Sequence, residues 1–156
     1  MQSPVNPTQA VLDRLFQQIL EGWDIPTPQG VLRLKQEDAV REVDAFPYPL
    51  VKNLAHAAYW QDIWLKMLEG TPRPPSMEVW KNDWREPDPS EYATPRRQFI
   101  EGVKRARWFA GEGFSTHKCA SDEKAVDLLL RIAIHDCYHL GQMNTLKRGL
   151  AKLRKK

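Results

Sequence analysis

A run of side chains near the end of the sequence recurs at alternating steps of three and four residues. Its members are Ala125, Leu128, Ile132, His135, His139, Gln142 and Leu146. This spacing places them on one face of a helix, the face that packs against neighbouring helices. Polar groups on a buried face need hydrogen bonds or a metal ion, because each unpaired group costs on the order of 1–3 kcal/mol. The pattern therefore predicts a long core helix whose buried polar residues are candidate functional residues.

Four long helices and one short helix are predicted along the chain. The long helices run from about Thr8 to Glu21, from Pro49 to Gly70, from Thr94 to Gly111 and from Ser121 to about Leu150, and the short one runs from Gln36 to Asp44. Thr94 and Ser121 are typical N-cap residues, and a proline follows Thr94 at the first helical position. No strand pair, repeat or linker is evident. We therefore expect an all-α fold with one domain over residues 1–156, a four-helix bundle.

The connection from Gly70 to Ala93 differs from the rest of the sequence. It contains five prolines and two tryptophans, Trp80 and Trp84. The prolines disfavour a regular helix, whereas two tryptophans are unusual in a flexible linker. We expect an irregular but ordered crossover that packs onto the bundle.

The net charge of +3 comes from one end of the chain. The last ten positions hold six basic residues and no acid, so the remainder has 17 basic against 20 acidic residues. Residues 151–156 are interpreted as a basic tail that follows a helix C-terminus, which favours basic side chains. Binding of nucleic acid through this tail is the less favoured interpretation, because no base-reading motif accompanies it.

The sequence also indicates a cytoplasmic protein. It has no apolar run of about 18 residues that could span a membrane, and its first residues lack the features of a secretory signal. Two cysteines, Cys119 and Cys137, do not make a disulfide framework.

His135 and His139 lie one helical turn apart, so their imidazoles can bind the same ion. His56 is the best third ligand, because it lies among small apolar residues and in line with Trp60 on the second long helix. Three protein ligands are typical of catalytic metal sites. The alternative is that the histidines are buried and hydrogen-bonded. His117 is expected in an exposed loop, outside the site.

Two neighbours of these histidines are less suitable for the site. Cys137 is two residues from both His135 and His139, roughly 200° round the helix from each, and is interpreted as an inert packed thiol. Asp136 occupies the position of the glutamate in the His-Glu-x-x-His metalloprotease motif, but with a shorter side chain. We expect Asp136 to be a surface residue or to support a ligand, rather than to act as a general base.

Two segments resemble motifs of the DinB/YfiT-like superfamily of metal-binding proteins. Residues 134–143, Ile-His-Asp-Cys-Tyr-His-Leu-Gly-Gln-Met, resemble its last-helix signature, and residues 54–60, Leu-Ala-His-Ala-Ala-Tyr-Trp, resemble its second-helix motif. The resemblance covers nearly the whole chain. It implies a four-helix bundle in up-down-down-up order, a divalent metal held by His56, His135 and His139, and a homodimer. It does not imply one reaction, since relatives include thiol-dependent transferases and isomerases, hydrolases and proteins without an assigned activity.

The leading hypothesis is a metal-dependent thiol transferase or hydrolase that acts on a small molecule. Three neutral imidazoles leave the charge of the ion unneutralised, so it would acidify a bound thiol or water. Trp60, Tyr138 and Gln142 are the candidate pocket residues, and no catalytic residue is assigned. Zn²⁺ or Ni²⁺ is expected, with Mn²⁺ or Fe²⁺ as further options. The alternative is a non-catalytic metal-binding or interaction protein.

A homodimer is also expected from the tryptophan content. The chain has six tryptophans, and two of them, Trp64 and Trp108, fall off the main core stripes of their helices. Pairing of two copies would cover this apolar area. The alternative is that the crossover covers it within one chain.

Overall fold

The computed structural model describes residues 6–154, and these residues form seven α-helices, one short 3-10 helix and no strand. The helices are α1 (Pro7–Glu21), α2 (Pro28–Val31), α3 (Gln36–Ala39), α4 (Leu50–Leu68), α5 (Ser76–Asn82), α6 (Ala93–Ala110) and α7 (Asp122–Leu153), with the 3-10 helix η1 at Phe114–Thr116. The predicted all-α fold is confirmed. None of the described helices is both long and apolar enough to cross a membrane.

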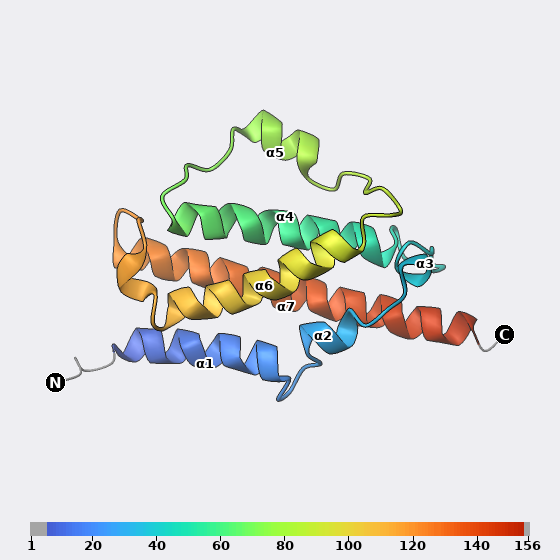
Figure 1. Cartoon of the computed structure of the whole chain (residues 1–156), viewed down its shortest axis with the longest axis horizontal. Coiled ribbons are helices and arrows are strands. Elements are labelled where there is room, and N and C mark those ends of the chain that lie inside the picture. Colours follow the sequence, from blue (N-terminus) through green and yellow to red (C-terminus); the bar gives the residue numbers. More distant parts are fainter. Residues whose placement is uncertain (1–5, 155–156) are drawn as a thin grey trace.

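The four long helices α1, α4, α6 and α7 pack around a common core (Figure 1). In Figure 1, α1 and α7 run from left to right, whereas α4 and α6 run from right to left. Helix α4 packs against both α6 and α7, and α1 packs against α6. Helices α6 and α7 each pack against the other three long helices, so they, rather than α4, are central to the bundle.

Local sequence explains where the first helix begins and ends. The side chain of Asn6 accepts a hydrogen bond from the backbone N–H of Thr8, and Pro7 occupies the first turn. Gly22 ends the helix in the left-handed conformation, with φ of 70°, which glycine adopts without steric cost. Between these ends, Leu12 and Phe16 are buried against the core.

Two predicted helix boundaries are wrong. Helix α6 begins at Ala93, and the N-cap position is taken by Tyr92 rather than Thr94. The backbone N–H of Thr94 already bonds to the carbonyl of Glu91, so Thr94 lies inside the helical turn. Helix α3 ends at Ala39 instead of Asp44, and the chain turns at Ala45, whose φ is 69°.

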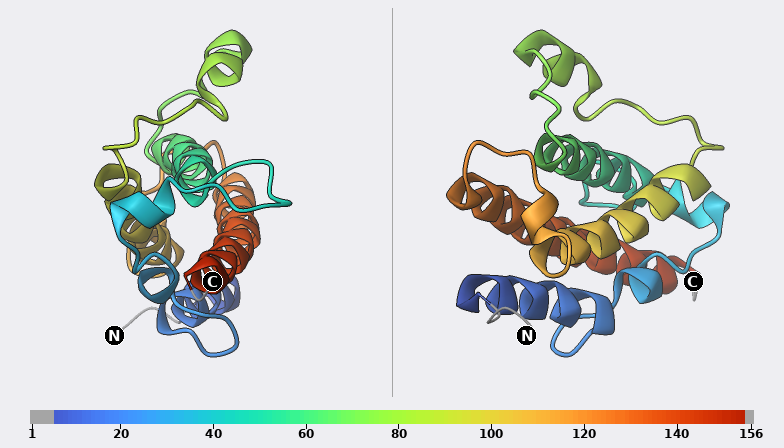
Figure 2. Two further views of the ribbon diagram at one scale, coloured as in Figure 1. Left: turned by 90° about the vertical axis from the view of Figure 1, so that its right-hand side faces the viewer. Right: turned by 60° about the vertical axis from the view of Figure 1, so that its left-hand side comes forward.

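The crossover contains a helix that was not predicted. Helix α5 follows directly after Pro75 and ends before Pro87, so the prolines lie outside it, where they remove no helical hydrogen bond. It stands apart from the long helices in every view (Figures 1 and 2). Trp80 on α5 is 78% exposed, whereas Trp84 packs on His56. The crossover therefore contacts the bundle through Trp84 after α5, and also through Arg73 before it, whose guanidinium lies over the ring of Trp60.

The C-terminal basic segment is more ordered than predicted. Helix α7 continues to Leu153, and the guanidinium of Arg154 pairs with the carboxylate of Asp38. The ammonium of Lys147 donates to the backbone carbonyl of Gly30. Residues 155 and 156 of the predicted tail lie outside the described residues.

Candidate metal centre

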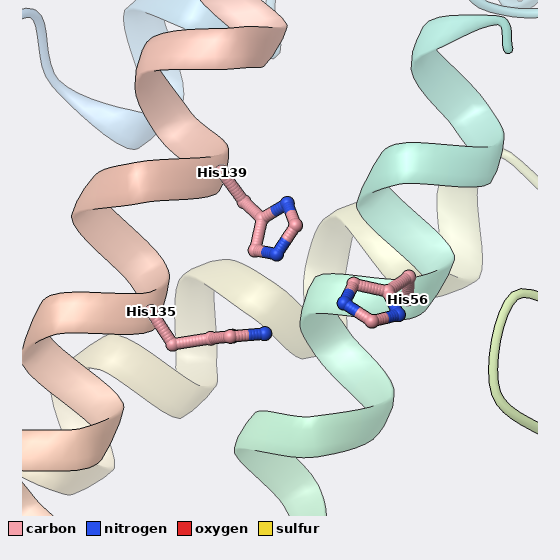
Figure 3. A group of neighbouring side chains, drawn as sticks. All are labelled: His56, His135 and His139. Carbon is pink, nitrogen blue, oxygen red and sulfur yellow. The ribbon is translucent and has the colours of Figure 1, made fainter. Parts of the chain in front are cut away.

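The structure brings His56, His135 and His139 together in the space between α4 and α7 (Figure 3). One ring nitrogen of each lies within 4.8 Å of the others. The ring centroids of His135 and His139 are 4.3 Å apart, and that of His56 is 4.7 Å from His139. His56 and His139 are buried and His135 is half-buried. His117 is not part of this group, as predicted.

His56 is oriented by a carboxylate from the crossover. Its Nδ1 lies 2.5 Å from Oδ1 of Asp83, and the indole N–H of Trp60 donates to the same oxygen at 3.2 Å. The indole of Trp84 stacks on the imidazole, with ring centroids 3.8 Å apart. Because a carboxylate only accepts hydrogen bonds, Nδ1 of His56 donates, and Nε2 is left with a free lone pair.

His139 is oriented by an amide on the facing helix. Its Nδ1 donates to Oδ1 of Asn53 at 2.9 Å, and Nδ2 of Asn53 donates to Oε1 of Gln142 at 2.9 Å. This chain of hydrogen bonds crosses from α7 to α4 and back to α7. It also leaves Nε2 of His139 as the nitrogen that can coordinate an ion.

His135 has an unsatisfied buried nitrogen. Its Nδ1 has no hydrogen-bond partner among the described residues, and the ring of Trp64 lies edge-on to it with centroids 5.0 Å apart. Such a group is costly to leave unpaired. In Figure 3 a nitrogen at the tip of the His135 ring points towards the other two histidines.

All three imidazoles are held neutral by their surroundings. Burial and the nearby histidines lower the pKa of His135 to about 3, and the same two effects lower the pKa of His139 to about 4. Burial lowers the pKa of His56 as well, although the carboxylate of Asp83 opposes this. Neutral imidazole is the form that coordinates a metal, so the three side chains are ready to bind one at pH 7.

The residues present fit a divalent ion after the rings turn towards one another. Bonds of about 2.0–2.1 Å in a tetrahedral zinc site place two nitrogens about 3.3–3.4 Å apart. The observed separations of up to 4.8 Å are wider, so the rings would move closer to one another when an ion binds. Asp83 and Asn53 would limit that movement to small rotations.

The three candidate pocket residues lie at different distances from the site. Trp60 lines a pocket that also contains His56 and His135. Gln142 supports Asn53, and hence His139, from one turn away. Tyr138 is 62% exposed, on the outer side of α7, with its ring edge-on to His139 at 5.0 Å.

Two predictions about neighbouring residues are wrong. The side chain of His117 lies in a loop but is only 10% exposed, because its Nε2 bonds to Asp122 and its Nδ1 accepts from the backbone of Cys119. Asp136 is fully buried rather than at the surface, and its Oδ2 accepts from Gln61 at 2.7 Å. Burial raises the pKa of Asp136 well above its usual range, which favours the neutral carboxyl.

Asp83 and Asn53 were missed by sequence reasoning. Asn53 could have been found, since it lies three residues before His56, on the same side of a largely apolar helix. Asp83 carries no such signal, because its position depends on how the crossover folds.

No protein-family model, curated protein or solved structure matches this chain. The geometry of the site is therefore the basis for the functional argument.

Proposed function

We propose that the chain is a DinB-like metalloprotein that binds one divalent transition-metal ion through His56, His135 and His139. The observation that carries this proposal is the convergence of three neutral imidazoles from two helices. The helix directions add support, since α1 and α7 run opposite to α4 and α6, in the up-down-down-up order that the DinB/YfiT-like resemblance implies. Zn²⁺ or Ni²⁺ is the expected ion, ahead of Mn²⁺ or Fe²⁺.

The site has the composition of a catalytic rather than a structural metal centre. Structural zinc sites are usually closed by four protein ligands, whereas three histidines leave a position open. A pocket adjoins His56 and His135, so a small molecule can reach that position. When bound, the ion supplies a Lewis acid that lowers the pKa of a coordinated thiol or water.

A thiol fits the surroundings better than water as the reacting group. Attack by water is often assisted by a nearby general base, and a carboxylate is one group that can serve. Asp83 Oδ1 is engaged by both His56 and Trp60, and Asp136 accepts from Gln61 within the core. A thiol bound as its anion needs no further base. We therefore place a thiol-dependent transferase ahead of a hydrolase.

The metal-binding part of the proposal is tested by elemental analysis of protein purified without a histidine tag. About one ion per chain is expected, and His135→Ala or His139→Ala should abolish stoichiometric binding. His56→Ala tests the third ligand, and His117→Ala is the matched control that retains the metal. Full occupancy in the His56→Ala variant would remove His56 from the site.

The catalytic part is tested with 1-chloro-2,4-dinitrobenzene and 2-mercaptoethanol as a general thiol-transfer pair, and with 4-nitrophenyl acetate for hydrolysis. Metal-dependent formation of the thioether, absent in His135→Ala, is the expected result. Ester hydrolysis in water alone would favour the hydrolase instead. Stoichiometric metal without turnover in either assay would favour the non-catalytic alternative.

A further inference from the structure

A cavity of about 420 Å³ begins at the candidate metal ligands and runs between α4 and α7, towards the end of α4 and the start of α7. Its size lies in the range of small-molecule pockets. The described residues that line it are His56, Trp60, Trp64, Met67, Arg73, Lys124, Leu128, Arg131 and His135. This lining has three basic side chains and no acidic one.

Two of the basic side chains share a helix face with His135. Lys124, Leu128, Arg131 and His135 are separated by steps of four, three and four residues, so they lie in one row along α7. Arg131 is one turn before His135, about 6 Å along the helix axis, and Lys124 is about two turns further. Two cationic side chains, Arg131 and Lys124, therefore lie on the same helix face as the candidate ligand His135, about one and three turns away from it.

The third cation comes from the opposite side of the cavity. Arg73 follows the end of α4, and its guanidinium carbon lies 5.9 Å from the ring centroid of Trp60. This contact holds a cation over an aromatic face, next to the hydrogen bond between Trp60 and Asp83. Arg73 thus extends over the pocket from the crossover side, facing the row on α7.

The charge around the cavity remains positive after nearby acids are counted. Asp127 pairs with both Lys124 and Arg131, at 3.5 and 2.9 Å, and Asp83 lies behind His56. Against three cations these two carboxylates leave an excess of one positive charge. A divalent ion held by three neutral imidazoles would add two more.

We propose that this cavity binds the negatively charged group of a small molecule whose reactive end lies at the metal site. The inference rests on the proposed function and narrows its substrate class to anions, such as carboxylates. Arg73, Arg131 and Lys124 contact the charged group, and guanidinium groups suit carboxylates because they can donate two parallel hydrogen bonds. Trp60, Trp64 and Leu128 contact the apolar part of the molecule between its charged and reactive ends.

Two thiols that differ in charge test the proposal. The probes are 3-mercaptopropanoate and 3-mercapto-1-propanol, which have the same chain length and the same thiol. Binding of each to Co²⁺-loaded protein is followed by the sulfur-to-cobalt charge-transfer absorption. The anion is expected to bind about tenfold more tightly than the alcohol, with a preference that falls as salt is added.

The double variant Arg73→Gln/Arg131→Gln should remove this preference and leave the affinity for the alcohol unchanged. Both side chains are exposed, so the fold should tolerate the change. Arg148→Gln, at an exposed position of α7 beyond His139, is the matched control that retains the preference. Equal affinity for the two thiols, or a preference that persists in the double variant, would overturn the proposal.

Failure of the metal site can be distinguished from failure of the anion site. If the protein takes up no Co²⁺, the proposed function fails, and the cavity is then tested in metal-free protein by titration with benzoate and with benzyl alcohol. Tryptophan fluorescence is the readout, because Trp60 and Trp64 line the cavity. A response to benzoate alone, absent in the double variant, supports the anion site, and no response to benzoate overturns it.

Discussion

The carboxylate of Asp83 lies 2.5 Å from Nδ1 of His56, although the two residues are 27 positions apart in the sequence. A carboxylate in this place selects the tautomer of the imidazole, fixes its orientation and makes the opposite nitrogen more basic. The crossover therefore contributes to the candidate metal site without providing a ligand.

Replacing Asp83 with asparagine should weaken metal binding by about 10–100-fold, the usual effect of losing a partner behind a histidine ligand. Competition with a chelator of known affinity measures this change. Asp88→Asn is the control, because Asp88 is an exposed crossover residue whose side chain, among the described residues, bonds only to Ser90. Equal loss of affinity in both variants would show that the effect does not come from the contact with His56.

The metal-free protein should lose stability as the pH falls from about 6.5 towards 3. An unfolded histidine titrates near 6.5, whereas folding lowers the pKa of His139 to about 4 and that of His135 to about 3. Between about pH 6.5 and these lowered pKa values, the unfolded chain binds more protons than the folded protein, so acid favours unfolding. The two histidines therefore make their full contribution to the free energy of unfolding only above about pH 6.5. Urea unfolding with a chelator present should show a shallower pH dependence in His135→Gln/His139→Gln. An unchanged dependence would contradict the role of these two groups.

Asp136→Asn should stabilise the protein, and the gain should grow as the pH rises. Folding raises the pKa of Asp136, so its contribution to stability is present at low pH and is lost as the pH increases. Asparagine keeps the acceptor for Gln61 and cannot ionise. Urea unfolding at pH 5, 7 and 8.5 measures the effect, with the exposed Asp62→Asn as control. Destabilisation at all three pH values would show that the carboxyl proton makes a contact that asparagine cannot replace.

Replacing each of two helical glycines with alanine should change the stability of the protein in opposite directions. A Cβ on Gly102 would lie 1.7 Å from Oε1 of Gln61, whose amide is held by Phe99 and Asp136, so Gly102→Ala should destabilise by about 1–3 kcal/mol. At Gly141 a Cβ meets no atom within 4 Å, so Gly141→Ala should stabilise by about 1 kcal/mol. Thermal unfolding compares the two. A neutral Gly102→Ala would mean that Gln61 moves freely.

We also propose that the protein is a homodimer whose contact surface does not include the metal ligands. Leu130, Ile134 and Tyr138 form an exposed apolar row on α7, with 40, 70 and 62% of each residue exposed. Light scattering at micromolar concentration should give twice 18.1 kDa, and Ile134→Asp should shift the mass towards one chain. A mass of one chain that does not change on concentrating the sample contradicts the dimer.

Periodicity explains why much of the fold could be predicted. The long helices bury rows of apolar side chains that recur over many turns. Because this periodicity is repeated so often, single residues that depart from it do not hide the helix. It also placed His135 and His139 on one face and directed His56 inward. Trp64, by contrast, was assigned to exposed apolar area, and it instead packs beside His135 at the pocket.

The wrong predictions concern features that depend on where single residues lie in the chain or in the fold, rather than on a repeating sequence pattern. The prolines of the crossover disfavour a helix only where they lie inside it, and α5 fits between Pro75 and Pro87. The contact of Asp83 with His56 depends on where the crossover meets α4, which no local pattern specifies. Buried Asp136 accepts from Gln61 of α4, and Gln61 has room there because Gly102 of α6 has no side chain, a contact that no local pattern specifies.

If an ion binds here, the position of Asp83 and Trp84 next to His56 would couple the order of a whole segment to the occupancy of the site. An ion that binds only the docked crossover stabilises that form by mass action. Residues 70–82 should consequently be cut faster by proteases when the protein is stripped of metal, and be protected when metal is restored. Limited proteolysis would then serve as a direct measure of metal content, because the accessibility of an exposed peptide segment would follow the loading of three histidine side chains.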